Sequence, residues 1–168
     1  EDLVNEVGKD SVRFMMLNRS NDVELDFDFE KVTEKSKDNP VFYVQYANAR
    51  INSIFSALNL NIDKKINIST DEIVFNEHEI DILKKIAEWP RCVEVSELKL
   101  EPHRIPYYLY DLATLFHSYW NFGQKNKECR FISEDKKINK SRILLLQSIS
   151  LVIKNGMSIL GVSSPKRM

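Results

Sequence analysis

The chain has few of the residues that interrupt or cross-link a polypeptide. Only 4 glycines and 5 prolines occur in 168 residues, which favours long uninterrupted helices. Cys92 and Cys129 have no paired spacing, so they fit partly buried thiols in a reducing compartment better than a disulfide scaffold. No apolar run reaches the length of a membrane span, and the opening EDLVNEVGKD is acidic. We therefore expect a cytoplasmic protein that does not enter a membrane.

Motifs for catalysis and for metal binding are also missing. His78, His103 and His117 are far apart, and none has a metal-ligand spacing to another histidine or to a cysteine. No glycine-rich phosphate loop, nucleophile elbow or reactive-cysteine signature occurs. We expect no catalytic residue, metal site or cofactor site in these residues.

The spacing of apolar residues predicts an all-α helical bundle. The length fits one domain with its own core, or one domain with a short appended piece. Helices are expected near residues 2–7, 11–18, 29–36, 40–58, 79–90, 92–100, 103–123 and 141–156. The last of these is apolar around most of its circumference, so we expect it to be the buried central helix.

Residues that begin and end helices mark these boundaries. Asn39 suits an N-cap, and Pro40 suits the first helical position, where a backbone N–H is not needed. Asp10 is expected to cap the helix that follows it. The expected helix stops are Gly8, Pro90, Gly123 and Asn155-Gly156.

The charge of the chain is unevenly distributed although its net value is only −1. Residues 1–40 hold 6 Lys+Arg against 11 Asp+Glu, whereas residues 124–168 hold 10 against 3. The basic C-terminal part suggests a partner that carries acidic groups, and a solvated face without a partner explains the pattern equally well.

The segment NPVFYVQYANARINSIF, residues 39–55, carries two tyrosines and an arginine beside its apolar face. At about 100° per residue, Tyr43, Tyr46 and Arg50 align about 100° away from the centre of the apolar stripe. Boundary tyrosines and an arginine stem that covers apolar surface would explain this line. The same line could also stack unpaired bases and hold a phosphate, which would make single-stranded RNA the target.

Four stretches, in this order, resemble the C-terminal part of arginyl-tRNA synthetase. They are DLVNEVGKDSVRFMMLNRSNDVELDFDF, SKDNPVFYVQYANARINSIF, YLYDLATLFHSYWN and RILLLQSISLVIKNGMSILGVSSPKRM. The combination of NPVFYVQYANAR with a terminal LGVSSPKRM makes the resemblance specific. It implies the helical DALR anticodon-binding domain of a class I enzyme, which activates arginine with ATP and transfers it to tRNA(Arg).

The resemblance implies RNA contacts by particular residues. In the family, the Tyr-x-x-Tyr-x-x-x-Arg line faces the anticodon loop and the final methionine lies close to it, which implicates Tyr43, Tyr46, Arg50 and Met168. The family usually has histidine where this chain has Asn48, so a contact by Asn48 stays open.

Three further residues are weaker candidates for the RNA surface. Trp120 could add another ring, although core packing explains a large aromatic at helical spacing better. Lys166 and Arg167 could attract the phosphate backbone. Lys125, Lys127, Lys136, Lys137 and Lys140 fit a solvated basic field.

The resemblance also implies a division within a longer enzyme. Residues 1–38 would be connecting helices after a catalytic domain, and residues 39–168 the anticodon-binding bundle. HIGH and KMSKS signatures are absent here, so ATP with Mg²⁺ is implied for the catalytic domain only, and this chain alone should be inactive. The implied partners are the tRNA(Arg) anticodon stem-loop and that catalytic domain, with a monomer expected. The alternative is a helical protein-interaction module without RNA specificity.

Overall fold

The structure, a computed structural model, describes residues 2–20, 32–65, 73–133 and 138–168. Its helices are α1 (Asp2–Val7), α2 (Lys9–Leu17), α4 (Pro40–Ala57), α5 (Glu77–Ala87), α6 (Trp89–Leu98), α7 (Arg104–Lys125) and α8 (Lys140–Leu160), with a 3₁₀ turn η2 (Lys127–Cys129). The described residues contain no strand. The predicted all-α class is confirmed. Of the helix predicted at residues 29–36, residues 29–31 lie outside the described residues, and only residues 32 and 33 of the remainder are helical.

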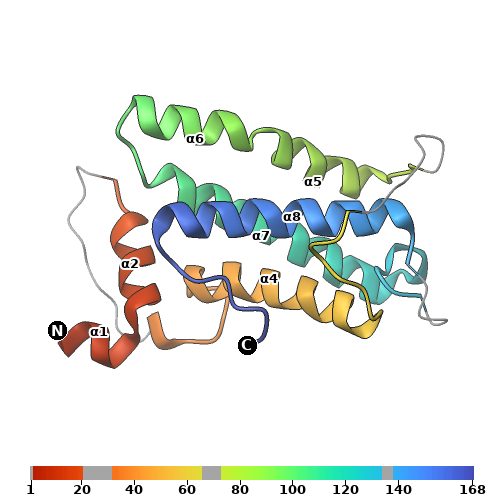
Figure 1. Ribbon diagram of the computed structural model, residues 1–168, viewed down its shortest axis with the longest axis horizontal. Coiled ribbons are helices and arrows are strands. Elements are labelled where there is room, and N and C mark those ends of the chain that lie inside the picture. The colour runs from red at the N-terminus through yellow and green to blue at the C-terminus, as the bar shows by residue number, and fades with distance from the viewer. Residues whose placement is uncertain (1, 21–31, 66–72, 134–137) are drawn as a thin grey trace.

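Helices α7 and α8 form the centre of the bundle. α7 contacts α4, α5, α6 and α8, and α8 also contacts α4 and α5. Figure 1 shows α4 on one side of this pair, α5 and α6 on the other, and α1 and α2 at one end. The C-terminal tail leaves α8 near α2 and runs back across α4 (Figure 1). The tail therefore reaches the helix that carries the tyrosine and arginine line.

The core is built from the apolar faces of α4, α7 and α8. Ile51, Leu112 and Ile149, one from each helix, have no exposed surface. Contrary to the expectation from the sequence, α8 is long and apolar enough to cross a membrane by length and composition. More than half of its apolar window, 56%, is buried in the bundle, as is usual for the core helix of a soluble fold.

The start of α4 follows the prediction. The Asn39 side chain accepts a hydrogen bond from the Phe42 N–H at 3.3 Å, and Pro40 is the first helical residue. The prediction for Asp10 is wrong, because α2 already begins at Lys9 after Gly8, whose φ is 86°. The Asp10 carboxylate accepts hydrogen bonds from the C-terminal tail instead, at the backbone N–H of Ser163.

Three of the predicted helix stops are wrong, because each of these residues lies inside a helix. Pro90 lies in the first turn of α6, where proline is tolerated, and α5 has already ended at Ala87. Gly123 lies inside α7, where a Cβ would stand 2.9 Å from the Cys129 carbonyl oxygen. Gly156 lies inside α8, where a Cβ would stand 2.7 Å from Leu109. The residue that ends α8 is Gly161, with a left-handed φ of 67°.

Candidate nucleic-acid interface

One side of α4 places an arginine beside two aromatic rings. Tyr46 and Arg50 lie one turn apart on α4, and Trp120 reaches them from α7. The guanidinium carbon of Arg50 is 4.4 Å from the Tyr46 ring centre and 5.0 Å from the Trp120 ring centre. These distances are typical of cation–π interactions. All three side chains are partly exposed, so the cluster lies at the surface beside the core.

His117 supports this cluster from below. Its Nδ1 lies 3.2 Å from Arg50 Nη1, and its Nε2 lies 3.2 Å from the Tyr43 carbonyl oxygen. A guanidinium only donates, so Nδ1 must accept and Nε2 must carry the proton that it donates to the carbonyl. Sequence reasoning considered His117 only as a metal ligand and missed this role. The one signal in the sequence is the three-residue spacing to Trp120, which puts both on one face of α7.

Burial keeps the His117 ring neutral. Only 3% of the residue is exposed, and desolvation lowers its pKa to about 4. The nearby Arg50 charge also lowers this pKa, whereas the hydrogen bond to the Tyr43 backbone raises it. Between pH 4 and the ordinary value of 6.5, the unfolded chain binds a proton here that the folded chain does not. Stability from this group is therefore present above pH 6.5 and is lost as the pH falls toward 4.

We predict that the free energy of unfolding depends on pH through His117. The difference between wild type and His117→Asn, measured by urea titration from pH 4 to 7.5, should change by roughly 3 kcal/mol over this range. The asparagine side chain cannot titrate, so the stability of the variant should not depend on pH through this position. The contributions of all other titratable groups cancel in the difference between the two proteins. Parallel profiles for the two proteins would contradict this assignment.

A groove of about 610 Å³ runs along the arginine cluster. Its wall is formed partly by α4 and α7 and partly by the last residues of the C-terminal tail. Small side chains, among them Ala49 and Ser53, form part of the lining, and 57% of Met168 is exposed. The groove brings together these predicted site residues: Tyr46, Arg50, Trp120, Lys166, Arg167 and Met168.

Asn48 lies beneath the tail and not at the surface. It has no exposed area, and its Nδ2 donates to the carbonyl oxygens of Ser164 at 3.2 Å and Pro165 at 3.1 Å. Its Oδ1 accepts from Ser150 Oγ at 2.8 Å. Every polar atom of its side chain is paired inside the protein, and Asn48 is not part of the groove lining. Its role in this structure is to hold the tail over α4.

Tyr43 also lies apart from the groove lining. Its ring packs against α7, with ring centres 4.4 Å from His117 and 5.2 Å from Tyr110. Gln45, on the buried side of α4, donates to the Ser163 carbonyl oxygen at 3.0 Å and so adds a second anchor for the tail. The α4 helix therefore presents Tyr46 and Arg50 on one side and fixes the tail with amide side chains on another.

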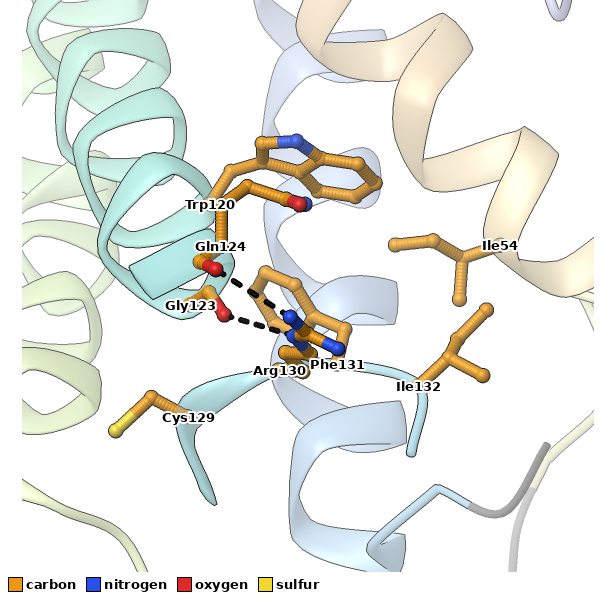
Figure 2. A pocket seen from close by; sticks show the side chains of 8 residues that line it. All are labelled: Ile54, Trp120, Gly123, Gln124, Cys129, Arg130, Phe131 and Ile132. Carbon is orange, nitrogen blue, oxygen red and sulfur yellow. Dashed lines mark hydrogen bonds between the residues drawn. The ribbon is translucent and has the colours of Figure 1, made fainter. Parts of the chain in front are cut away.

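Trp120 borders a second, smaller cavity of about 110 Å³ on its other flank. Figure 2 shows its indole and the Phe131 ring on one side, with Ile54 and Ile132 opposite them. The ring centres of Trp120 and Phe131 are 6.1 Å apart. Trp120 is thus both a packing residue, as its helical spacing favours, and part of the groove wall.

Most of the chain, including the residues around the groove, matches a known protein family. Residues 44–168 match the DALR anticodon binding domain. The chain belongs to this family. The match includes Tyr46, Arg50, Trp120 and the whole C-terminal tail, so every residue that lines the groove lies within the DALR domain.

Relatives of this DALR domain are found within longer proteins. The chain is 60% identical over 168 residues to an arginine–tRNA ligase of Pelagibacter ubique and 49% identical over 173 residues to one of Brucella ovis. These matches cover 100% and 99% of this chain. The chain spans only 29% and 30% of the length of these two relatives.

Solved structures share the fold of the DALR domain. A crystal structure described as an arginyl-tRNA synthetase from Campylobacter jejuni superposes with a TM-score of 0.79 at 26% identity, covering 99% of this chain and 35% of that one. The arginyl-tRNA synthetase of Thermus thermophilus superposes with a TM-score of 0.77 at 22% identity, covering 99% and 27%. The predicted resemblance and fold type are confirmed.

The other charged and ligating residues that the structure describes in the DALR domain lie outside the groove. Lys125, Lys127 and Lys140 are exposed and are not part of the groove lining, and Lys136 and Lys137 lie outside the described residues. No group of three His, Cys, Asp or Glu side chains that could hold a metal ion occurs among the described residues. His78, for example, packs against Phe122 with ring centres 4.6 Å apart.

Proposed function

We propose that this chain is the tRNA(Arg) anticodon-binding part of an arginine–tRNA ligase, a cytoplasmic enzyme that attaches arginine to tRNA(Arg) with ATP. The observation that carries the proposal is the groove of the DALR domain, where two aromatic rings, one guanidinium and a basic tail converge. The curated relatives, which are arginine–tRNA ligases about three times as long, support the parent activity.

The proposed mechanism is recognition of an opened anticodon loop. Rings such as Tyr46 and Trp120 stack unpaired bases, each stacked base contributing about 1 to 3 kcal/mol. Arg50 would donate to a base edge or a phosphate, and Met168 would close the groove. Lys166 and Arg167 would attract the backbone and set the orientation of the loop without reading its sequence. Tyr43, which packs below the groove, would support the two helices.

The proposed division of the parent enzyme keeps chemistry and recognition apart. Residues 1–38 would connect the catalytic domain to the bundle of residues 39–168. The parent enzyme would be a monomer. We assign ATP and Mg²⁺ to the catalytic domain, because the HIGH and KMSKS signatures that bind the nucleotide in class I enzymes do not occur in this sequence. Docking of the anticodon here would bring the acceptor end of the tRNA to the active site elsewhere in the ligase.

The first test is competition binding of the chain with two RNA stem-loops at two salt concentrations. One carries the tRNA(Arg) anticodon, and the other differs only in its central anticodon base. We predict tighter binding of the first loop, because base contacts in the groove discriminate where phosphate contacts cannot. The preference should persist at the higher salt and disappear in Tyr46→Ala.

Equal binding of both loops that is erased by salt would contradict the proposal. Such binding is the behaviour of phosphate contacts alone, since the released counterions make it depend on salt and not on sequence. A helical protein-interaction module predicts that outcome or no binding at all.

A further inference from the structure

We infer that His117 is a positioning residue for Arg50: its unprotonated Nδ1 accepts a guanidinium hydrogen and fixes the direction in which the arginine faces the groove. The inference rests on the proposed function, because it deepens the account of the same RNA site. It gives a binding role to a histidine that does not line the groove itself.

The geometry that supports this role joins two helices. Arg50 comes from α4 and His117 from α7, and their nitrogen atoms are 3.2 Å apart. The other ring nitrogen is held by the backbone of α4 through the Tyr43 carbonyl oxygen at 3.2 Å. Both ring nitrogens are therefore committed to α4, one to its backbone and one to the arginine. The ring cannot turn without losing both hydrogen bonds.

An arginine at the surface needs such support before it can bind well. Its long side chain loses rotamer freedom when it is held in one place, and that loss weakens binding unless the folded protein has already imposed it. Here the Tyr46 and Trp120 rings restrict the tilt of the guanidinium plane, while the hydrogen bond to His117 restricts rotation of the guanidinium within that plane. His117 uses one of five N–H donors, so donors remain for RNA.

The surroundings of His117 favour the neutral ring that this role requires. The charged group facing it is Arg50, and the other groups against it are the Tyr43 and Tyr46 rings of α4 and the Phe116 ring of α7. A proton on Nδ1 would point at another N–H donor and would put two positive charges side by side. Burial lowers the His117 pKa in the same sense.

The test is a double-mutant cycle on binding of the tRNA(Arg) anticodon stem-loop at pH 7.5. His117→Leu should weaken binding about tenfold in the wild-type chain, the effect of losing one hydrogen bond to a charged group. In the Arg50→Ala background the same change should alter binding by less than about twofold, because the residue it positions is gone. Losses that simply add would overturn the inference.

The conservative variant His117→Asn provides the control. Its side chain can still accept from Arg50, so it should retain most of the affinity. An equal loss of affinity in His117→Leu and His117→Asn would count against a positioning role.

A second readout needs no RNA and separates this inference from the proposed function. Nitrogen NMR of the free chain at pH 7 should show His117 protonated at Nε2 only. The Arg50 Nε–H should become more mobile in His117→Leu but not in His117→Asn, with urea unfolding confirming that both variants are folded. A proton at Nδ1, or unchanged Arg50 mobility, would refute the positioning role even if the chain binds the anticodon. Failure of wild type to prefer the tRNA(Arg) loop, with both NMR results as expected, would refute the RNA proposal alone.

Discussion

Arg50→Ala is expected to weaken binding of the tRNA(Arg) anticodon stem-loop by about a hundredfold, which corresponds to roughly 3 kcal/mol. The change removes the guanidinium that lies between Tyr46 and Trp120 and that is the group best placed to donate to a base edge or a phosphate. It also leaves His117 Nδ1 without its donor. In the proposed parent ligase, the same change should lower kcat/KM for tRNA in the charging reaction by a similar factor.

The matched control for this experiment is Arg91→Ala. Arg91 is an exposed residue of α6, which lies on the opposite side of the central helices from α4 (Figure 1). The two variants lose the same charge, so a shared loss would reflect only general attraction to RNA. We expect near wild-type binding for Arg91→Ala. Similar losses in both variants would contradict the assignment of Arg50 to the site.

Arg50→Lys separates charge from geometry at the same position. Lysine keeps the positive charge but lacks the planar fork that stacks on rings and donates two parallel hydrogen bonds. We therefore expect this variant to resemble Arg50→Ala in its loss of discrimination between the two stem-loops, while it retains part of the salt-dependent binding. Full retention of discrimination would show that only charge matters at this position.

The parts of the fold that local chemistry determines could be predicted from the sequence. Asn39 and Pro40 together specify the first turn of α4, because a side-chain acceptor and a residue without an N–H both satisfy the unpaired helix start. The placement of Tyr46 and Arg50 at the edge of the core follows from helical periodicity alone. These features depend on neighbours within a few residues.

The parts that depend on tertiary contacts could not be predicted in this way. Gly123 and Gly156 look like helix stops in the sequence, and only the approach of η2 and Leu109 in space shows why glycine is needed inside these helices. The bond between Arg50 and His117 joins residues 67 positions apart. The sequence alone does not show that Asn48 is buried, because the tail residues that cover it are more than 100 positions away. Spacing within one helix carries no information about these partners.

The clearest tertiary feature outside the groove is a buried carboxylate, Glu79, which is 2% exposed. Its Oε1 accepts hydrogen bonds from Tyr119 Oη and from Arg142 Nε, both at 2.6 Å, and its Oε2 caps α5 at the Asn76 N–H. Burial and the adjacent Glu79 raise the pKa of Tyr119 well above its usual value, so its hydroxyl remains a donor. This network ties α5, α7 and α8 together at the end of the bundle.

Arg142→Met is expected to lower the free energy of unfolding by about 3 to 5 kcal/mol, a large share of the stability of a small domain. The substitution keeps the volume of an unbranched side chain but leaves the Glu79 carboxylate buried without its cation. It also removes the donors to the carbonyl oxygens of Arg130 at 2.7 Å and Glu128 at 2.8 Å. Urea unfolding at pH 7 measures the change.

The double variant Glu79→Gln/Arg142→Met identifies the cause of that loss. Glutamine can still accept from Tyr119 but carries no charge, so the double variant should recover stability relative to Arg142→Met if the unpaired charge dominates. Lys154→Met, on the same helix, breaks an exposed ion pair with Asp63 and should cost less than about 1 kcal/mol. A double variant as unstable as Arg142→Met would instead place the cost in lost hydrogen bonds, namely those to the two carbonyl oxygens and that of the Asn76 N–H, which would face the amide nitrogen of the glutamine.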